Sequence, residues 1–529
     1  MMPGSLGLRT PRVPAHARAL PTLRAAGPAW LLVMLVALFA GVALAALVAA
    51  VVAWTPAAIV AVALAVPTTL WIAGGAATSV VGLIAPPPPS RPLPPGWRPN
   101  GRLAVLTTLC GEPPEPVAER LAALHADLAA SPLAGAATLY ALSDTRGADR
   151  VAAEERALAP LVASGRVIYR RRADNAGRKP GNIADWLARA GAEHDHMLVL
   201  DADSWMRADR IARLVHRMER EPRLGLIQAG MRLVPAATRF GRAQRTAARL
   251  LGGPFVRGFA ASTGETGNYW GHNALIRVAA FREAGALKGL PGRAPFGGDV
   301  LSHDFIEAAQ LARAGWAVEV DPDTAGSAEG GPQTLADFHR RDRRWCQGNL
   351  QHLRLIGSPG YAPLSRLHLA SGIFSYLAAP CWLVLFLLAG SGAVALSGWA
   401  PAVAVVTLLA VPKLCGLATW LPRARTAARR RTVLRAAASE AVTSTLVAPM
   451  VMMRQTGAVL SVLAGRDCGW RTGVPAVRLM PPGGAEALAG AAAGAALLAA
   501  NPGAAPWFVP VLAPLLAAPV LVPWLERAP

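Results

Sequence analysis

The stretch His196-Met-Leu-Val-Leu-Asp-Ala-Asp-Ser204 joins an apolar run to a pair of carboxylates. The apolar run predicts a short buried strand, and Asp201 and Asp203 follow at its carboxyl end, where ligands bind in mostly parallel sheets. Side chains at positions i and i+2 of an extended chain point to the same side, so these carboxylates suit an oxygen-ligated Mg²⁺ or Mn²⁺ that in turn holds a diphosphate. A solvated, Asp-rich turn is the alternative interpretation.

Short apolar strands alternate with amphipathic helices on both sides of this stretch. The strands are predicted at 103–109, 137–142, 166–171, 196–200, 225–229 and 274–278. The helices are predicted near 115–130, 150–163, 181–190, 207–220 and 240–251. This alternation is typical of an α/β fold with a mostly parallel sheet. It predicts one domain over residues 98–357, preceded by a Pro-rich linker over residues 85–97.

Hydrophobic spans bracket the predicted domain, because a bilayer is crossed by roughly 20 apolar residues in a helix. Spans are predicted at 30–54, 57–84, 373–396, 402–421, 486–500 and 507–525. The helix predicted at 436–463 carries Glu440 and Arg454, and an arginine near mid-membrane costs about 2.5 to 3.5 kcal/mol. We therefore expect 436–463 to lie in the membrane interface, which leaves six spans rather than seven. The chain is divided into a transmembrane hairpin over residues 30–84, the domain, and a transmembrane region over residues 358–529.

The net charge of +21 would also fit a nucleic-acid-binding protein. No run of interleaved aromatic and basic residues supports that class, so no nucleic-acid partner is expected. Arginines precede the first span and follow the fourth, in the loop over residues 423–435. The positive-inside rule then places the N-terminal segment, residues 1–29, and the domain in the cytoplasm. Five scattered cysteines indicate neither a disulfide framework nor a zinc site.

Other candidate functional residues lie at strand ends and helix starts of the same domain. Asp144 follows the strand predicted at 137–142. Lys179 and Asn182 belong to a Gly-rich loop that opens a helix, which suits a phosphate but is also an ordinary loop and cap. Asp304 lies in the first turn of a predicted helix. It is either a general base for an acceptor hydroxyl or a carboxylate stabilised by the helix dipole.

A helix predicted to start near Thr334 places Arg341, Arg344 and Trp345 on one face. The guanidinium groups could neutralise a leaving diphosphate, while Trp345 offers a flat apolar face to a sugar ring. A basic helix lying against anionic lipid is the competing interpretation.

Together these motifs resemble the processive inverting glycosyltransferases of the cellulose-synthase superfamily and, within it, the glucans biosynthesis glucosyltransferase H family. The resemblance is carried by Leu142-Ser-Asp-Thr-Arg146, Tyr169-Arg-Arg-Arg172, Gly177-Arg-Lys-Pro-Gly-Asn-Ile-Ala-Asp-Trp186, His196 to Ser204, Tyr269-Trp-Gly-His-Asn-Ala274, Leu301-Ser-His-Asp-Phe305 and Arg340-Arg-Asp-Arg-Arg-Trp-Cys-Gln-Gly-Asn-Leu350. It implies a GT-A type nucleotide-diphospho-sugar transferase domain inserted between transmembrane helices, in the bacterial inner membrane. The implied activity is an inverting hexosyltransferase that polymerises glucose from UDP-glucose into a β-linked, β-1,2 periplasmic glucan and exports it.

The resemblance also implies a role for each candidate residue. Asp144 contacts the uridine, and Lys179 and Asn182 lie near the nucleotide or its phosphates. Asp201 lies by the donor, and Asp203, with Asp201, holds the metal, Mg²⁺ or Mn²⁺. Asp304 is the catalytic base, and the basic helix residues Arg341, Arg344 and Trp345 hold the diphosphate and the growing glucan end. Membrane lipid, an acyl carrier protein and a periplasmic glucan-modifying protein are the implied partners.

Arg341 stands where the superfamily has a glutamine, a substitution that the H family shares. Two alternatives stay open. One is another processive synthase, making cellulose or a different β-glucan. The other is a membrane transport or scaffold protein that binds a nucleotide sugar without turnover. Transport alone would not need Asp304.

Overall fold

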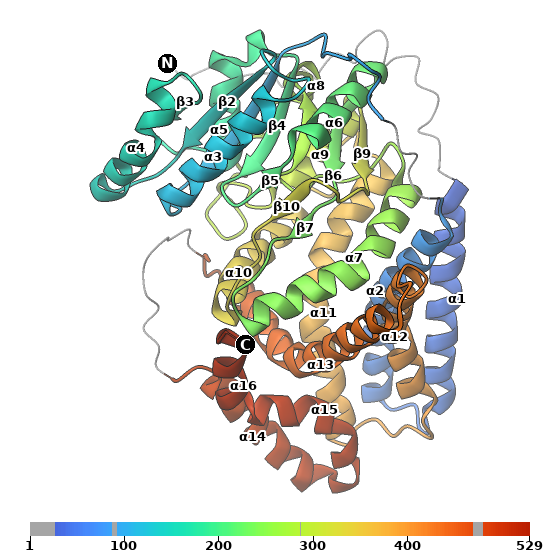
Figure 1. The fold of residues 1–529 in the computed structure, drawn as a ribbon. Coiled ribbons are helices and arrows are strands. Elements are labelled where there is room, and N and C mark those ends of the chain that lie inside the picture. The colour runs from blue at the N-terminus through green and yellow to red at the C-terminus, as the bar shows by residue number, and fades with distance from the viewer. Residues whose placement is uncertain (1–26, 87–91, 286, 469–479, 529) are drawn as a thin grey trace, which may run out of the picture.

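The computed structural model describes residues 27–86, 92–285, 287–468 and 480–528, and it divides into an α/β domain and a helical region (Figure 1). The predicted N-terminal segment, residues 1–29, and the middle of the predicted linker, residues 85–97, lie mostly outside the described residues. The helices nearest the two ends of the described chain belong to the helical region. The α/β domain is therefore an insertion between apolar helices, as the fold class predicted from the sequence requires.

The domain is built on a seven-stranded sheet in the order β3-β2-β1-β4-β8-β6-β9. Its strands are β1 (Leu103–Leu109), β2 (Ala137–Ser143), β3 (Ile168–Arg171), β4 (His196–Asp201), β6 (Leu224–Ala229), β8 (Ala274–Arg277) and β9 (Ala317–Asp321). All neighbouring pairs are parallel except those of β8, which runs antiparallel to β4 and β6. The six strands predicted from apolar runs are confirmed, while β9 was missed.

A second, small sheet in the order β5-β10-β7 lies beside the carboxyl end of β4. Its strands are β5 (Trp205–Met206), β7 (Arg232–Leu233) and β10 (Ser327–Glu329). Two- and three-residue strands carry no periodic pattern, so no sequence signal predicted them. The register that pairs Ala328 with Trp205 and with Arg232 brings Glu329 next to the end of β4.

Helices cover both faces of the large sheet, and each face has its own apolar core. One face is covered by α3 (Pro114–Ala129), α4 (Ala148–Ala163) and α6 (Ala208–Arg220), and the other by α5 (Arg178–Arg189), α8 (Val278–Ala284) and α9 (His303–Arg313). These helices include the four predicted near 115–130, 150–163, 181–190 and 207–220, which are confirmed. A sheet buried on both faces explains why its strands read as continuous apolar runs.

Within the described residues, five helices are long and apolar enough to cross a membrane. They are α1 (Gly27–Ala50), α2 (Pro56–Ile84), α11 (Pro363–Gly390), α12 (Ala400–Trp420) and α13 (Ala427–Leu463). The helix α14 (Gly484–Ala500) is shorter. The predicted span 507–525 is not one straight helix: α15 (Ala505–Leu516) and α16 (Ala518–Glu526) meet at a bend of 57°. Pro519, next to that bend, lacks the amide hydrogen that would continue the helix.

The helix α13 begins at Ala427, nine residues before the predicted start, and runs across the direction of α1 and α2 (Figure 1). Both of the charged residues used to argue that it does not cross the membrane have partners. Glu440 pairs with Lys413 of α12, and Arg454 pairs with Glu486 of α14. Pairing lowers the cost of burying these charges, so the interfacial position of 436–463 stays a prediction.

The α/β domain is held against the first helical hairpin by α7 (Arg239–Thr263), which was predicted only as far as residue 251. Where α7 crosses α2, the two backbones touch through glycines. A Cβ atom added at Gly258 would lie 1.8 Å from the Thr78 carbonyl oxygen, and one added at Gly82 would lie 1.7 Å from the Pro254 carbonyl oxygen. No larger residue fits at either position without moving one helix away from the other.

We predict that Gly258→Ala destabilises the protein by about 1 to 3 kcal/mol, because the added methyl group must push α7 off α2. Gly253→Ala, on the same helix with nothing within 4 Å of the added atom, is the control and should be neutral or slightly stabilising. Thermal unfolding of the two purified variants in detergent checks this. Equal unfolding temperatures for both variants would contradict the close packing of the two helices.

Candidate active site

The predicted site residues gather where β1, β2 and β4 end. Asp144 directly follows β2, Asp201 is the last residue of β4, and Thr108 of β1 is paired in register with Asp201. Because these strands are parallel, their carboxyl ends lie at one edge of the sheet. Residues at least 36 positions apart in the sequence therefore lie at one edge of the sheet.

Asp144 forms a two-bonded ion pair with Arg172. The guanidinium Nε and Nη2 atoms lie 2.8 Å and 2.6 Å from the two carboxylate oxygens. Asn175 also donates to the Asp144 carbonyl oxygen, at 2.6 Å. A cavity of about 360 Å³ opens beside this pair and is lined by Arg146, Arg171 and Arg172, among others. Arg172 was not among the predicted site residues, although the basic run 170–172 at the end of β3 was a signal.

Lys179 joins three segments of the chain. Its amine contacts the Asp201 carboxylate and donates to the carbonyl oxygen of Gly271, at 2.7 Å. Thr108 donates to the same carboxylate, at 3.3 Å. Burial alone would raise the pKa of Asp201, but the charges of Lys179, His272 and Arg341 and the bond from Lys179 together outweigh burial and hold that pKa below its usual value. Asp201 is therefore ionised at neutral pH.

Asn182 is buried, and its side chain forms hydrogen bonds within the protein. Its side-chain nitrogen donates to the Leu142 carbonyl oxygen at 3.0 Å, and its side-chain oxygen accepts from Arg170. These bonds hold the start of α5 against β2. The contact with substrate predicted for Asn182 stays a prediction, and the geometry favours an indirect contribution through the loop that carries Lys179.

Asp203 does not follow Asp201 along an extended chain, so that part of the sequence prediction is wrong. The strand ends at Asp201, and Ala202 and Asp203 form a turn closed by a bond from the Ser204 amide to the Asp201 carbonyl oxygen, at 3.0 Å. Arg120 stabilises the turn by donating to the Ala202 carbonyl oxygen. Partial burial and the Asp201 charge raise the pKa of Asp203.

Two neighbouring carboxylates, one of them with a raised pKa, fit a divalent cation, which would relieve their repulsion. No group of three or more His, Cys, Asp or Glu side chains suited to a metal occurs among the described residues. A cation at Asp201 and Asp203 would therefore need further oxygen ligands from a bound phosphate or from water.

A buried network that the sequence did not predict links this turn to α10 (Leu335–Gln351). The His272 Nδ1 atom lies 3.0 Å from the Ser204 hydroxyl, and Nε2 lies 3.3 Å from a Glu329 oxygen. The same Glu329 oxygen lies 3.6 Å from an Arg341 nitrogen. Burial alone would lower the pKa of His272, but its bond to Glu329 and the negative charges of Asp201 and Glu329 together outweigh burial and raise it. The sequence did contain one signal of this network. Arg341 stands where the superfamily has a glutamine, and a partly buried arginine needs an acidic partner such as Glu329.

Asp304 lies in the first turn of α9, near the α-carbon of Gly271. A Cβ atom added at Gly271 would lie 3.6 Å from an Asp304 carboxylate oxygen, and Gly271 has a φ of +88° that favours glycine. Burial raises the pKa of Asp304, although the charge of His303 acts in the opposite direction. A carboxyl with a raised pKa beside the Asp201 site is suited to accept a proton.

The predicted face of α10 borders this cluster. The Arg341 guanidinium carbon lies 4.3 Å from the centroid of the Trp345 ring, which is 43% exposed. Burial and the nearby charge of Arg341 lower the pKa of Arg344. Two close guanidinium groups and an exposed ring favour an anion together with a flat sugar ring. The structure thus brings together Lys179, Asp201, Asp203, Asp304, Arg341 and Trp345, while Asp144 lies two strands away, after the end of β2.

Comparisons with known proteins agree with this geometry. Residues 196–420 match the family model described as "Glycosyl transferase family group 2". The chain is 40% identical to "Glucans biosynthesis glucosyltransferase H" of Cereibacter sphaeroides, over 77% of this chain and 73% of the relative. It is 43% identical to the protein of the same name from Bradyrhizobium diazoefficiens, over 70% of this chain and 54% of the relative.

Among solved structures, the chain is similar to the mannosyltransferase PcManGT from Pyrobaculum calidifontis in complex with GDP-Man and Mn²⁺. The TM-score is 0.47 at 18% sequence identity, covering 72% of this chain and 97% of that one. The family model and the strand order establish the α/β domain as a GT-A-like glycosyltransferase fold carried by a membrane protein.

We predict that Glu329 and His272 are energetically coupled. Thermal or denaturant unfolding of Glu329→Gln, His272→Gln and the double variant should give a coupling free energy of about 1 to 3 kcal/mol, because either change leaves a buried partner unsatisfied. The exposed pair Arg340 and Asp337 is the control, with an expected coupling below about 0.5 kcal/mol. Additive effects at Glu329 and His272 would show that the network does not act as a unit.

Proposed function

Because the chain belongs to the glucans biosynthesis glucosyltransferase H family, and is thus a glucosyltransferase of glucan biosynthesis, we propose that it extends a β-linked glucan from UDP-glucose with inversion. The linkage that we propose is β-1,2, the donor is UDP-glucose, and the acceptor is the growing glucan. The domain boundaries that we propose are residues 98–357 for the transferase domain and residues 30–84 and 358–529 for the membrane region.

The observation that carries this proposal is the arrangement around Gly271. Its carbonyl oxygen binds Lys179, which also binds Asp201, while Asp304 borders its α-carbon. A carboxyl with a raised pKa, Asp304, thus lies beside a cationic and acidic cluster suited to a diphosphate. One base next to one leaving-group site is what a direct displacement requires, and direct displacement inverts the anomeric carbon.

On the donor side, Arg172 lines the cavity that we assign to the uridine and pairs with Asp144, and Lys179 pairs with Asp201. Asp201 and Asp203 would hold Mg²⁺ or Mn²⁺. The cation, when bound, neutralises charge that develops on the departing diphosphate. Arg341 and Arg344 supply further positive charge from α10.

On the acceptor side, Asp304 removes the proton from a hydroxyl of the growing glucan. The freed oxygen attacks the anomeric carbon of the donor glucose, the new C–O bond forms as the bond to UDP breaks, and UDP leaves on the opposite face. Trp345 offers its exposed ring to the terminal sugar. Asn182 contributes by positioning the loop of Lys179.

The membrane region supports export of the product. We propose that the domain lies on the cytoplasmic side of the bacterial inner membrane and that the glucan leaves through a path formed by α11 and α12, with α13 at its cytoplasmic mouth. This rests on the arginines of the loop 423–435 and on the packing of α13 against both α10 and α11. Contacts with an acyl carrier protein and a periplasmic glucan-modifying protein are expected from the family resemblance.

The test of this function uses the full chain in sealed liposomes with its transferase domain facing outward. External radiolabelled UDP-glucose with Mg²⁺ or Mn²⁺ should yield a β-1,2 glucan inside the vesicles. Chelation of the metal should reduce synthesis by about 100-fold or more, because the leaving diphosphate loses its countercharge. Product that stays outside the vesicles would overturn export. Another linkage would indicate a neighbouring synthase, and UDP binding without transfer would favour a non-catalytic protein.

Asp304→Asn should lower kcat by about 100- to 10,000-fold without weakening UDP binding, because the amide cannot accept the proton. Asp209→Asn on the surface of α6 is the matched control and should keep full activity. In the unaltered enzyme, burial raises the pKa of Asp304, so kcat/KM should fall as the pH is lowered through that raised pKa and the base becomes protonated. Normal turnover by Asp304→Asn would remove Asp304 from the mechanism.

A further inference from the structure

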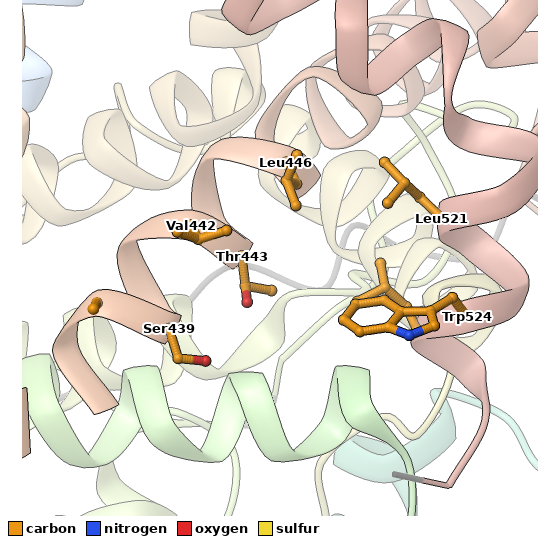
Figure 2. A pocket seen from close by; sticks show the side chains of 8 residues that line it. Ser439, Val442, Thr443, Leu446, Leu521 and Trp524 are labelled. Atoms are coloured by element: carbon orange, nitrogen blue, oxygen red, sulfur yellow. The ribbon is translucent and has the colours of Figure 1, made fainter. Parts of the chain in front are cut away.

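A cavity of about 300 Å³ lies between α13 and α16, outside the candidate active site (Figure 2). Val442 and Leu446 of α13 form one side, and Leu521 and Trp524 point toward them from α16. The hydroxyls of Ser439 and Thr443 are the only side-chain polar groups of α13 in the lining. The wall is otherwise hydrocarbon, apart from the Trp524 indole nitrogen.

This lining excludes the ligands of the transferase reaction. A sugar or a nucleotide needs several hydrogen-bonding partners when it leaves water, and two hydroxyls on one helix cannot supply them. An alkyl chain needs none. The cavity lies in the helical region that the sequence predicts to be in the membrane, and its Val442 and Trp524 are 59% and 48% exposed. Lipid chains are therefore the apolar groups with direct access to it.

Positive charge lies at the rim of the cavity. Arg435 is one turn before Ser439 on α13, about 6 Å along the axis and on the same face. It is exposed and has no ion-pair or hydrogen-bond partner within the described chain. Arg239 of α7 contacts Trp524, which lines the cavity. Its guanidinium carbon is 5.1 Å from the Trp524 ring centroid, and it donates to the Trp524 carbonyl oxygen at 3.3 Å.

Nearby acidic groups do not cancel this charge, because they face other elements. Glu440, next to the lining, is 5% exposed and pairs with Lys413 of α12. Glu526, at the end of α16, accepts a bond from the Ala336 amide of α10, at 3.4 Å. An apolar cavity with a net positive rim is complementary to a molecule that has a hydrocarbon chain and an anionic head.

We propose that this cavity binds one acyl chain of an anionic phospholipid, with the lipid phosphate held by Arg435 and Arg239. Leu525, which lines the cavity, also belongs to a buried cluster with Leu335 and Phe338 of α10. That helix carries Arg341 and Trp345. The bound lipid thus completes the packing of the membrane region beside the start of the helix that borders the active site.

The first test counts lipids on the detergent-purified full chain by native mass spectrometry, after incubation with palmitoyl-oleoyl phosphatidylglycerol or phosphatidylcholine. Retention of phosphatidylglycerol should exceed that of phosphatidylcholine by about fivefold or more. Arg435→Gln should remove this preference. Arg429→Gln is the control, because Arg429 is exposed on the same helix but about 120° away around its axis, and it should keep the preference.

The second test places the acyl chain and does not depend on headgroup charge. Phosphatidylglycerol with brominated acyl chains should quench part of the tryptophan fluorescence, and Trp524→Phe should abolish that part. Ser439→Phe, which fills the cavity, should prevent the same quenching in a protein that still elutes as a single species. Equal retention of the two lipids, an unchanged preference in Arg435→Gln, or quenching that is independent of Trp524 would each overturn the proposal. None of these outcomes depends on glucosyl transfer.

Discussion

The ammonium group of Lys179 holds together the three segments from which the candidate site is built. It binds the carboxylate at the end of β4 and the carbonyl oxygen of Gly271, and its own position is set by the loop that opens α5. Gly271 in turn touches Asp304 at the start of α9. A single charged group therefore sets the distance between the leaving-group side and the base side of the reaction. The charge of Lys179 is also the largest of those that lower the pKa of Asp201, whereas burial raises the pKa of Asp304, which suits proton transfer.

Basic and acidic side chains alternate in the network beside this centre. His272 lies between Ser204 and Glu329, and Glu329 lies between His272 and Arg341. Each buried charge has an opposite charge as its neighbour, which is the condition under which ionic groups can be buried at a tolerable cost. The chain runs from the turn that holds Asp203 to the face of α10 that carries Trp345. The turn of Asp203 and the face of α10 are thereby connected through His272 and Glu329, to which no substrate contact is assigned.

Two kinds of contact hold the helical region together: close contact between helix backbones and pairing of opposite charges. Gly82 and Gly258 allow α2 and α7 to touch, which seats the transferase domain on the first hairpin. The pairs Lys413 with Glu440 and Arg454 with Glu486 tie α13 to α12 and α14. The position of α13 matters because it packs against α10 on one side and borders the apolar cavity on another.

The sequence by itself determined the strands β1, β2, β4, β6 and β8 and the helices between them, because each is long enough to show an apolar run or a helical period. It also placed Asp144, Asp201 and Asp304 at element ends, where chemistry collects in parallel sheets. Only the tertiary structure decided the turn at Asp203, the network of His272, Glu329 and Arg341, and the bend between α15 and α16. The strands β5, β7 and β10 are too short to leave a pattern, and they pair residues more than 90 positions apart. Pairing between such short strands depends on which surfaces the fold brings together, so it cannot be predicted from the local sequence.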